Sequence, residues 1–421
     1  MPAQPWLGRV DQTAMRILAA TPVTGPYVVA RYRRFAETHP QHELTLLEFG
    51  RVSRDYAWLP SDDVVPYQRV VLSEGPVNGL RPAERVRLIQ GALARLRPEV
   101  LVVCGYGVTG MACALRRARV MAPGVPVVLL SDSTSDDRAR VPWLEAIKRR
   151  LVGQCSAALV AGRIHADYLA GLGMPRDSIL LGYDVVDNAY FADGAEAARR
   201  DASALRARLG LPPRYFLTVA RFIRADGGVD RVKNLHRLIA AYDAFRSGAA
   251  AAAWGLVILG DGELRPELEA QIDRLGLHGQ VLLPGFRQYP ELPPYYGLAS
   301  AFVMPSLKET WGLVVNEAMA AGLPVLVSRR CGCAAELVED GRNGWTFDPL
   351  DVAGLTDLMR RIAADEAGSA TMGQASRKII DQWTPDTFAR NLGRAVEVAR
   401  RVPAAAPGLI DELILWTMQY R

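Results

Sequence analysis

The sequence predicts an α/β protein with two doubly wound domains, each built on a parallel sheet. Three observations support this fold class. The chain has 421 residues, which is enough for two domains of ordinary size. Short apolar runs of strand length alternate with helical stretches in both halves, as in sheets whose strands are joined by crossover helices. A Leu-Pro-Pro break at residues 211–213 separates the two series.

Composition narrows the class of protein. Hydrophobic residues make up 50% of the chain and charged residues 23%, which is typical of a soluble globular protein. The N-terminus lacks a signal peptide's apolar core, and no apolar run reaches the roughly 18 residues of a membrane span. The five cysteines lie mostly in apolar runs, which suits a reducing compartment. We therefore expect a cytoplasmic protein, and a net charge of +5 gives no reason to expect a nucleic-acid partner.

The first domain is expected over residues 1–195. Apolar runs of strand length predict strands at residues 15–20, 44–49, 100–104, 125–130 and 157–160. In a parallel sheet, the loops that follow the strands share one edge, and ligands bind there. In this domain those loops are residues 22–26, 105–110 and 131–137.

Two helical stretches of this domain are basic. Residues 143–151, WLEAIKRRL, predict a surface helix that buries Trp143, Ile147 and Leu151 at a spacing of four. The cationic side of this helix also suits peripheral contact with an anionic membrane, on its inner face. Residues 27–35 leave the same two interpretations open, because they carry Arg31, Arg33 and Arg34 among aromatic side chains.

The second domain is expected over residues 214–392, after a linker of residues 196–213. An Ala/Arg-rich stretch predicts a helix at residues 194–209, before the domain's first strand. Strands are predicted at residues 215–220, 255–259, 281–283, 302–304 and 325–327, with a helix from residue 233 to about residue 246. A terminal segment, residues 393–421, contains a predicted helix at residues 409–418, with Leu409, Ile410, Leu413 and Ile414 on its apolar face.

Residues 301–327 carry the clearest indication of chemistry, because they form a strand, a loop, a helix and a strand in that order. The loop, residues 307–312, lies before a helix N-terminus, whose free N–H groups attract an anion. Glu309 lies in this loop and Glu317 lies about five residues into the helix. A carboxylate repels phosphate but accepts hydrogen bonds from two neighbouring hydroxyls. Phosphate beside sugar and ribose hydroxyls indicates a nucleotide-sugar.

The same segment carries a resemblance to a known family. The pattern PS-x-x-E-T-W-G-L-V-x-x-E-A-M-A-x-G-x-P-V resembles the signature of the retaining, GT-B-fold glycosyltransferases of glycosyltransferase family 4. The similarity extends over about residues 215–349 and is looser in the first half of the chain. It implies two Rossmann-like domains facing across a cleft, with a C-terminal helix that crosses back to the first domain. It also implies transfer of a hexose, with retention, from a UDP- or GDP-sugar to an acceptor hydroxyl without a divalent metal.

The resemblance assigns roles to individual residues. Arg221 and Lys233 match the cations that flank the donor's diphosphate, and Glu309 and Glu317 match the residues at its sugar and its ribose. The family's nucleobase and phosphate surroundings fall on Phe286, Arg287 and Gly25, although Gly25 is equally compatible with an ordinary turn. The loop and helix start that would line the donor are Thr310, Trp311, Gly312 and Leu313.

One position departs from the family. Many members have a histidine at the end of the strand that corresponds to residues 127–130, where it contacts the transferred sugar. This chain has Ser131 and Asp132 there. Asp132 either takes over the contact as a hydrogen-bond acceptor or caps a helix together with Ser133.

Other functions remain open from the sequence. A nucleotide-sugar 2-epimerase has the same architecture, and a catalytically inactive protein that only binds nucleotide-sugars would keep the donor site. The acceptor is not indicated: a lipid-linked glycan, a small metabolite such as an aminocyclitol and a polysaccharide end all fit. Cys331-Gly332-Cys333 is interpreted as packing around a tight turn rather than as half of a metal site.

Overall fold

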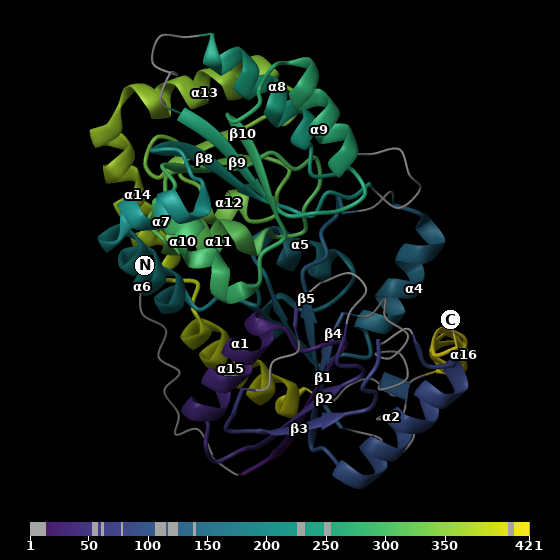
Figure 1. Cartoon of the computed structure of the whole chain (residues 1–421). Coiled ribbons are helices and arrows are strands. Elements are labelled where there is room, and N and C mark those ends of the chain that lie inside the picture. Colours follow the sequence, from purple (N-terminus) through teal and green to yellow (C-terminus); the bar gives the residue numbers. More distant parts are fainter. Residues whose placement is uncertain are drawn as a thin grey trace, which may run out of the picture.

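The computed structural model describes residues 14–52, 58–59, 63–76, 79–105, 115–116, 125–137, 140–224, 232–247, 254–402 and 408–420. Two parallel sheets, each covered by helices, form two Rossmann-like domains (Figure 1). The predicted fold class is therefore confirmed. Most of the predicted loop 105–110 and the sequence between Arg224 and Val232 lie outside the described residues.

The first sheet has seven strands in the order β3-β2-β1-β4-β5-β6-β7, and all its pairings are parallel. Strand order changes direction between β1 and β4, which makes this position the switch point of the sheet. The central strands are apolar and buried on both faces, as expected of a covered parallel sheet. The strands are β1 Arg16–Thr21, β2 Glu43–Glu48, β3 Gln68–Val71, β4 Val100–Cys104, β5 Val127–Ser131, β6 Ala157–Val160 and β7 Ile179–Leu181.

The second sheet has six strands in the order β10-β9-β8-β11-β12-β13, again all parallel. Its switch point lies between β8 and β11. The strands are β8 Arg214–Val219, β9 Trp254–Leu259, β10 Val281–Gly285, β11 Ala301–Met304, β12 Val325–Ser328 and β13 Gly344–Phe347. Helices near the site include α8 Leu235–Arg246, α10 Leu292–Leu298 and α11 Leu313–Ala320.

The chain crosses between the domains twice. After β7 it enters α6 Asn188–Arg200, which packs against α10 and α11 of the second domain. It returns before α15 Pro385–Arg401, which packs against α1 Pro26–Thr38 of the first domain. The return therefore occurs earlier than residue 393, the boundary expected from the sequence. The last helix, α16 Leu409–Met418, packs against α4 Pro142–Val152 on the outside of the first domain (Figure 1).

Three strands were not predicted, and all three lie at sheet edges. β3, β7 and β13 are three or four residues long and mostly half-buried, so they lack the fully apolar run that marks a central strand. The helix predicted at residues 194–209 is two helices, α6 and α7 Ala202–Leu209, which meet at Asp201. The ends of the strands that were predicted lie within two residues of their predicted positions.

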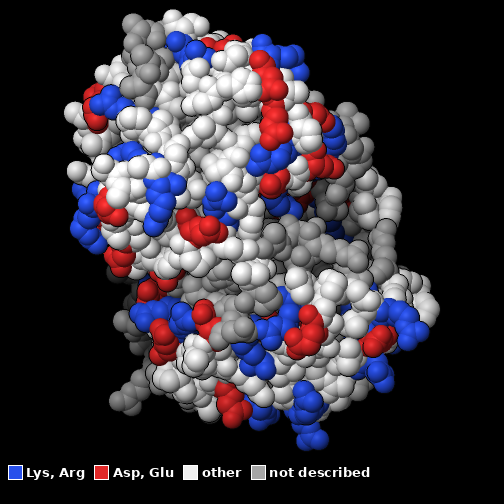
Figure 2. All heavy atoms as spheres, viewed as in Figure 1, with Lys and Arg blue, Asp and Glu red and all other residues white. Residues whose placement is uncertain are grey.

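The arginines of α1 are largely engaged within the protein. Arg31 forms a buried ion pair with Asp184, with 3.2 Å between nitrogen and oxygen. Arg33 pairs with Asp63, and Arg34 pairs with Asp386 of α15. In the view of Figure 2, cationic and acidic side chains are interspersed over both domains rather than gathered on one basic face.

Helix α4 differs from its prediction at one residue. Trp143 is 62% exposed, whereas Leu151 is buried and Ile147 packs against the core as expected. Lys148 donates hydrogen bonds to Glu145 (2.8 Å) and to the hydroxyl of Tyr168 (2.9 Å), so it is held against the protein. Among the described residues, no helix is both long and apolar enough to cross a bilayer.

Candidate active site

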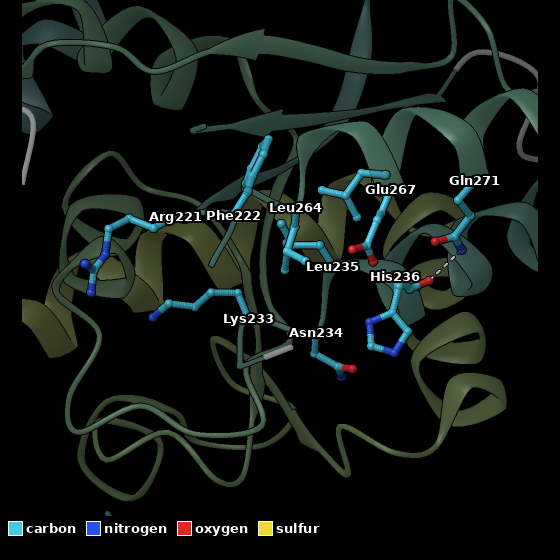
Figure 3. Close-up of a pocket in the computed structure, with 10 residues that line it drawn as sticks. Arg221, Phe222, Lys233, Asn234, Leu235, His236, Leu264, Glu267 and Gln271 are labelled. Atoms are coloured by element: carbon cyan, nitrogen blue, oxygen red, sulfur yellow. Dashed lines mark hydrogen bonds between the residues drawn. The ribbon is translucent and has the colours of Figure 1, made fainter. Parts of the chain in front are cut away.

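The predicted phosphate-binding cations lie at the switch point of the second sheet. Arg221 follows β8, and the loop of residues 305–312 follows β11, its neighbour across that point. Lys233 precedes α8 and lines the same narrow pocket as Arg221. Figure 3 shows the charged ends of Arg221 and Lys233 extending to the same side. Open α/β sheets bind ligands at this place.

Lys233 is joined to the loop by a direct contact. Its ammonium group donates a hydrogen bond to the carboxylate of Glu309, and both side chains are largely buried. Asn234 fixes this arrangement, because its side-chain amide donates to the backbone oxygens of Pro305 (3.0 Å) and Pro349 (2.7 Å). The sequence therefore brings a cation and a carboxylate together at the carboxyl edge of the sheet.

The loop of residues 309–312 is held by the turn at residues 331–333. The backbone N–H of Gly332 donates to the oxygen of Glu309 (3.0 Å), and that of Cys333 donates to the oxygen of Trp311 (3.2 Å). A Cβ atom at Gly332 would lie 1.7 Å from the oxygen of Thr310, so only glycine fits there. Cys331 and Cys333 are buried and pack within the hydrophobic core of the second domain.

Gly312 starts the helix that follows this loop. It has φ +111°, a conformation that favours glycine, and it precedes the first residue of α11, Leu313. The first N–H groups of a helix have no partner within the helix, so the Gly312–Leu313 junction presents donors beside Lys233 and Glu309.

The first domain contacts the loop through Asp132. This residue directly follows β5, and its Oδ2 accepts a hydrogen bond from the hydroxyl of Thr310 at 2.8 Å. No helix starts at Ser133 in the described chain, since the next one is α4 at Pro142, so the helix-cap alternative is not realised. Asp132 is therefore an acceptor at the domain interface.

A histidine reaches the same loop from another element. His165, in α5 Arg163–Gly171, donates from Nε2 to the backbone oxygen of Thr310 (2.9 Å) and accepts at Nδ1 from the N–H of Gly162 (3.1 Å). Burial lowers the pKa of His165, which favours this neutral form. Nothing in the sequence pointed to His165, because its partner is a backbone oxygen 145 residues away.

Glu317 is fully buried and already has two partners. The hydroxyl of Tyr27 in α1 donates to Oε1, and the hydroxyl of Tyr296 in α10 donates to Oε2, each at 2.5 Å. Burial raises the pKa of Glu317 to about 7, and the two hydroxyls oppose that rise. The sequence predicted a carboxylate facing the cleft, whereas here it links the two domains.

Trp311 does not face a ligand through its side chain. The indole is 2% exposed, donates from Nε1 to Asn316 (2.9 Å) and packs against Trp383. Arg287 also turns inwards, because its Nε donates to the hydroxyl of Tyr295 (3.0 Å). Both of these predicted donor-binding side chains are therefore engaged in contacts within the protein.

Gly25 and Phe286 are brought together by a residue that the sequence did not indicate. Trp58 of the first domain lies beside Gly25, the residue before α1, and its ring centroid is 5.4 Å from that of Phe286. Tyr27 and Tyr289 join the same group, with ring centroids 5.7 Å apart. These aromatic residues come from distant elements, so no local motif contains them.

The part of the chain that the structure describes contains no cluster of three or more His, Cys, Asp or Glu side chains that could hold a metal ion.

Comparison with known proteins gives the family context. Residues 211–379 match the model of the family "Glycosyl transferases group 1". The chain is 29% identical over 253 residues to the alpha-D-kanosaminyltransferase of Streptomyces kanamyceticus, covering 58% of this chain and 62% of that protein. It is 37% identical over 131 residues to the D-inositol 3-phosphate glycosyltransferase of Streptomyces avermitilis, covering 31% and 28% respectively. The chain thus spans less than two thirds of the length of these relatives.

Solved structures share the fold over about nine tenths of the chain. Sucrose-phosphate synthase from Thermosynechococcus elongatus superposes with a TM-score of 0.70 at 18% identity, covering 90% of this chain and 98% of that one. Anabaena HepE in complex with UDP and glucose superposes with a TM-score of 0.68 at 18% identity, covering 91% and 99%. The family model thus matches most of the second domain, and the solved structures share the two-domain GT-B fold.

Proposed function

We propose that the protein transfers a hexose, with retention of anomeric configuration, from a UDP- or GDP-sugar to an acceptor hydroxyl. One observation carries the proposal: Arg221, Lys233 and the start of α11 converge at the switch point of the second sheet, with Glu309 in contact with Lys233. This arrangement combines donors for a diphosphate with an acceptor for sugar hydroxyls.

The cations would act on the leaving group. As the bond between the sugar's anomeric carbon and the diphosphate breaks, negative charge grows on the phosphate oxygens. Arg221, Lys233 and the N–H groups at the Gly312–Leu313 junction would stabilise that charge, as preorganised donors do in an oxyanion hole. The site would then need no divalent metal to neutralise the diphosphate.

Retention would follow from the path of the proton. The acceptor hydroxyl forms the new bond at the anomeric carbon on the face that the diphosphate leaves, and its proton passes to the departing phosphate oxygen. Glu309 would accept hydrogen bonds from the sugar's hydroxyls and so hold the sugar in place. Asp132 would reach the same sugar from the first domain, where it now accepts a hydrogen bond from Thr310.

Glu317 would bind the ribose by exchanging partners. Its two oxygens can accept hydrogen bonds from neighbouring hydroxyls, but Tyr27 now occupies one of them. Tyr27 belongs to the first domain, so a small opening of the two domains would release it. Tyr296, in the second domain beside Glu317, would stay.

The names of relatives guide the choice of substrates. HepE was solved with UDP-glucose, which makes UDP-glucose the first donor to test. The 2-deoxystreptamine glucosyltransferase of Streptomyces kanamyceticus, 28% identical over 256 residues, is named for an aminocyclitol acceptor. An aminocyclitol is therefore the first acceptor to test.

The direct experiment incubates the purified protein with UDP-, GDP- and ADP-sugars and measures released nucleotide, with and without acceptor. We expect slow hydrolysis of one donor and faster release with an acceptor, with the product retaining the donor's anomeric configuration. Interconversion of the sugar without acceptor would indicate an epimerase instead. Nucleotide binding with no turnover against any acceptor would indicate a binding protein.

A further inference from the structure

The C-terminal helix α16 is apolar on two opposite sides. On its inner side, Leu415 is fully buried in the core of the first domain, and Ile414 and Met418 pack against the same core. On the opposite side, Leu413 is 60% exposed and Trp416 is 50% exposed. A helix that is apolar all round is usually covered on both sides, and this helix is covered on one.

The exposed side forms a continuous stripe. Residues 409, 413, 416 and 420 follow one another at spacings of four, three and four, which places them on one side of a helix. The apolar face predicted from the sequence is divided: Ile414 packs against the first domain, whereas Leu409, Ile410 and Leu413 face outwards. We call this group the outer stripe; it comprises Leu409, Ile410, Leu413, Trp416 and Tyr420, which are 92%, 56%, 60%, 50% and 44% exposed.

The charges of this helix are turned away from the outer stripe. Asp411 pairs with Arg150 of α4 at 3.1 Å, and Glu412 pairs with Arg116 at 3.3 Å. These are the two acidic residues in the helix, so its negative charge is neutralised against the first domain. Arg150 remains 46% exposed beside α16, and its neighbour Arg149 is also exposed. Cations therefore lie next to an apolar surface.

We propose that the outer stripe inserts into the interface of a bilayer that contains anionic phospholipid. The aromatic residues Trp416 and Tyr420 lie at one end of the stripe, and such rings favour the level of the lipid headgroups. Arg149 and Arg150 would contact the anionic headgroups while the aliphatic side chains enter the acyl boundary. Figure 1 shows α16 on the outside of the first domain, where a flat surface can reach it.

A second copy of the chain fits this surface less well. An aromatic side chain buries about 150–250 Å² when fully covered and Leu or Ile buries less, so five residues that are 44–92% exposed offer on the order of 500 Å². A stable dimer needs about 800 Å² from each partner. A bilayer has no such minimum, because insertion of a few apolar side chains beside cations already gives reversible binding.

Co-sedimentation of the full chain with vesicles tests the proposal. We expect the protein to bind vesicles of phosphatidylcholine and phosphatidylglycerol, and to bind phosphatidylcholine alone more weakly. The double variant Leu413→Gln/Trp416→Gln should bind at least about tenfold more weakly, because two inserted side chains become polar. Trp416→Phe should retain binding, since it keeps an aromatic ring at that position.

A matched control separates this effect from general hydrophobicity. Leu275→Gln/Leu350→Gln removes two exposed apolar side chains, 37% and 49% exposed, from the second domain. This variant should bind vesicles like the wild type. Equal loss of vesicle binding in both double variants, or no binding to anionic vesicles at low salt, would overturn the proposal.

Light scattering completes the test: a wild-type dimer that the Leu413/Trp416 variant converts to a monomer would identify a second copy as the occupant. Nucleotide-sugar hydrolysis in the absence of vesicles should be equal in all variants, so this test is independent of the proposed transferase activity.

Discussion

Tyr27 of the first domain donates its hydroxyl hydrogen to Oε1 of Glu317 in the second domain, at 2.5 Å. The two residues are 290 positions apart in the chain, and their contact closes the domains over the carboxylate that we propose for the ribose. A ribose hydroxyl and the Tyr27 hydroxyl would therefore compete for the same oxygen.

This competition predicts opposite effects for two variants. At about pH 8, where Glu317 is ionised, Glu317→Ala should weaken nucleotide binding by at least about tenfold, because a charge-assisted hydrogen bond contributes roughly 1.5–3 kcal/mol. Tyr27→Phe should instead tighten binding by a few-fold, since it removes the competing hydroxyl. Tyr296→Phe is the matched control and should not tighten binding, because Tyr296 stays in place when the ribose binds.

Calorimetry with 2′-deoxynucleotides completes that test. The wild type should bind a 2′-deoxynucleotide more weakly than the ribonucleotide, whereas Glu317→Ala should bind the two almost equally. The losses of binding free energy caused by the deoxy change and by the substitution should therefore not add. If the losses add, Glu317 does not contact the ribose and serves only to join the domains.

The raised pKa of Glu317 predicts a pH dependence of stability. The carboxyl group keeps its proton up to about pH 7 in the folded chain but ionises near its ordinary pKa of 4.5 in the unfolded chain. The contribution of Glu317 to the free energy of unfolding is therefore fully present below about pH 4.5 and is lost as the pH rises through about 7. The total change in this free energy is on the order of 3 kcal/mol.

Thermal unfolding measured from pH 5 to pH 8 checks this sign. Glu317→Gln cannot titrate, so the midpoint of the wild type should fall relative to that of the variant as the pH rises. Asp184, whose pKa burial also raises to about 7, titrates in both proteins and cancels in the difference. A constant difference across this range would show that Glu317 is ionised throughout.

Glu309 should affect transfer more than donor binding. Glu309→Gln keeps the shape of the side chain but removes the charge next to Lys233, so we expect transfer to fall by about a hundredfold or more. Nucleotide affinity should be unchanged or slightly tighter, because Lys233 loses a competing carboxylate. Steady-state kinetics gives the rate of transfer, and calorimetry on the same preparation gives the nucleotide affinity. Equal losses in transfer and in binding would contradict the role assigned to Glu309.

The proposed stabilisation of the leaving group by Arg221 and Lys233 predicts that activity resists removal of divalent metals. Activity should be nearly the same with EDTA as with added Mg²⁺ or Mn²⁺. Arg221→Ala removes one of the proposed cations, so its activity with and without Mg²⁺ shows whether a metal can partly replace that side chain. Complete dependence of the wild type on a divalent cation would refute the proposed stabilisation of the leaving group.

The central parts of the fold could be predicted from the sequence, and the edges could not. β4 and β11 are continuous apolar runs because helices cover both of their faces. The edge strand β13 has two half-exposed residues among four, so its pattern resembles that of a loop. Short edge strands form because a neighbouring strand offers hydrogen bonds, and that information is not local.

The residues of the candidate site could likewise be predicted only in part. Lys233 and Glu309 could be placed together, because each lies at a strand end or helix start on one edge of the sheet. Tyr27, Trp58 and His165 could not, since their roles depend on how the domains face each other. The same reason explains α16: its two apolar sides are visible in the sequence, but which side packs inwards depends on the first domain's surface.

The most direct test of the account compares the binding of UDP and uridine to Lys233→Ala by calorimetry, with Lys308→Ala as the control. Lys308 is an exposed lysine in the same loop as Glu309, so it matches Lys233 in charge but lies outside the proposed diphosphate contacts. We expect Lys233→Ala to weaken UDP binding by about tenfold or more, which corresponds to at least about 1.4 kcal/mol, and to leave uridine binding unchanged. Lys308→Ala should bind both like the wild type. An equal effect of the two lysines on UDP, or the same loss for uridine as for UDP, would contradict the proposed donor site.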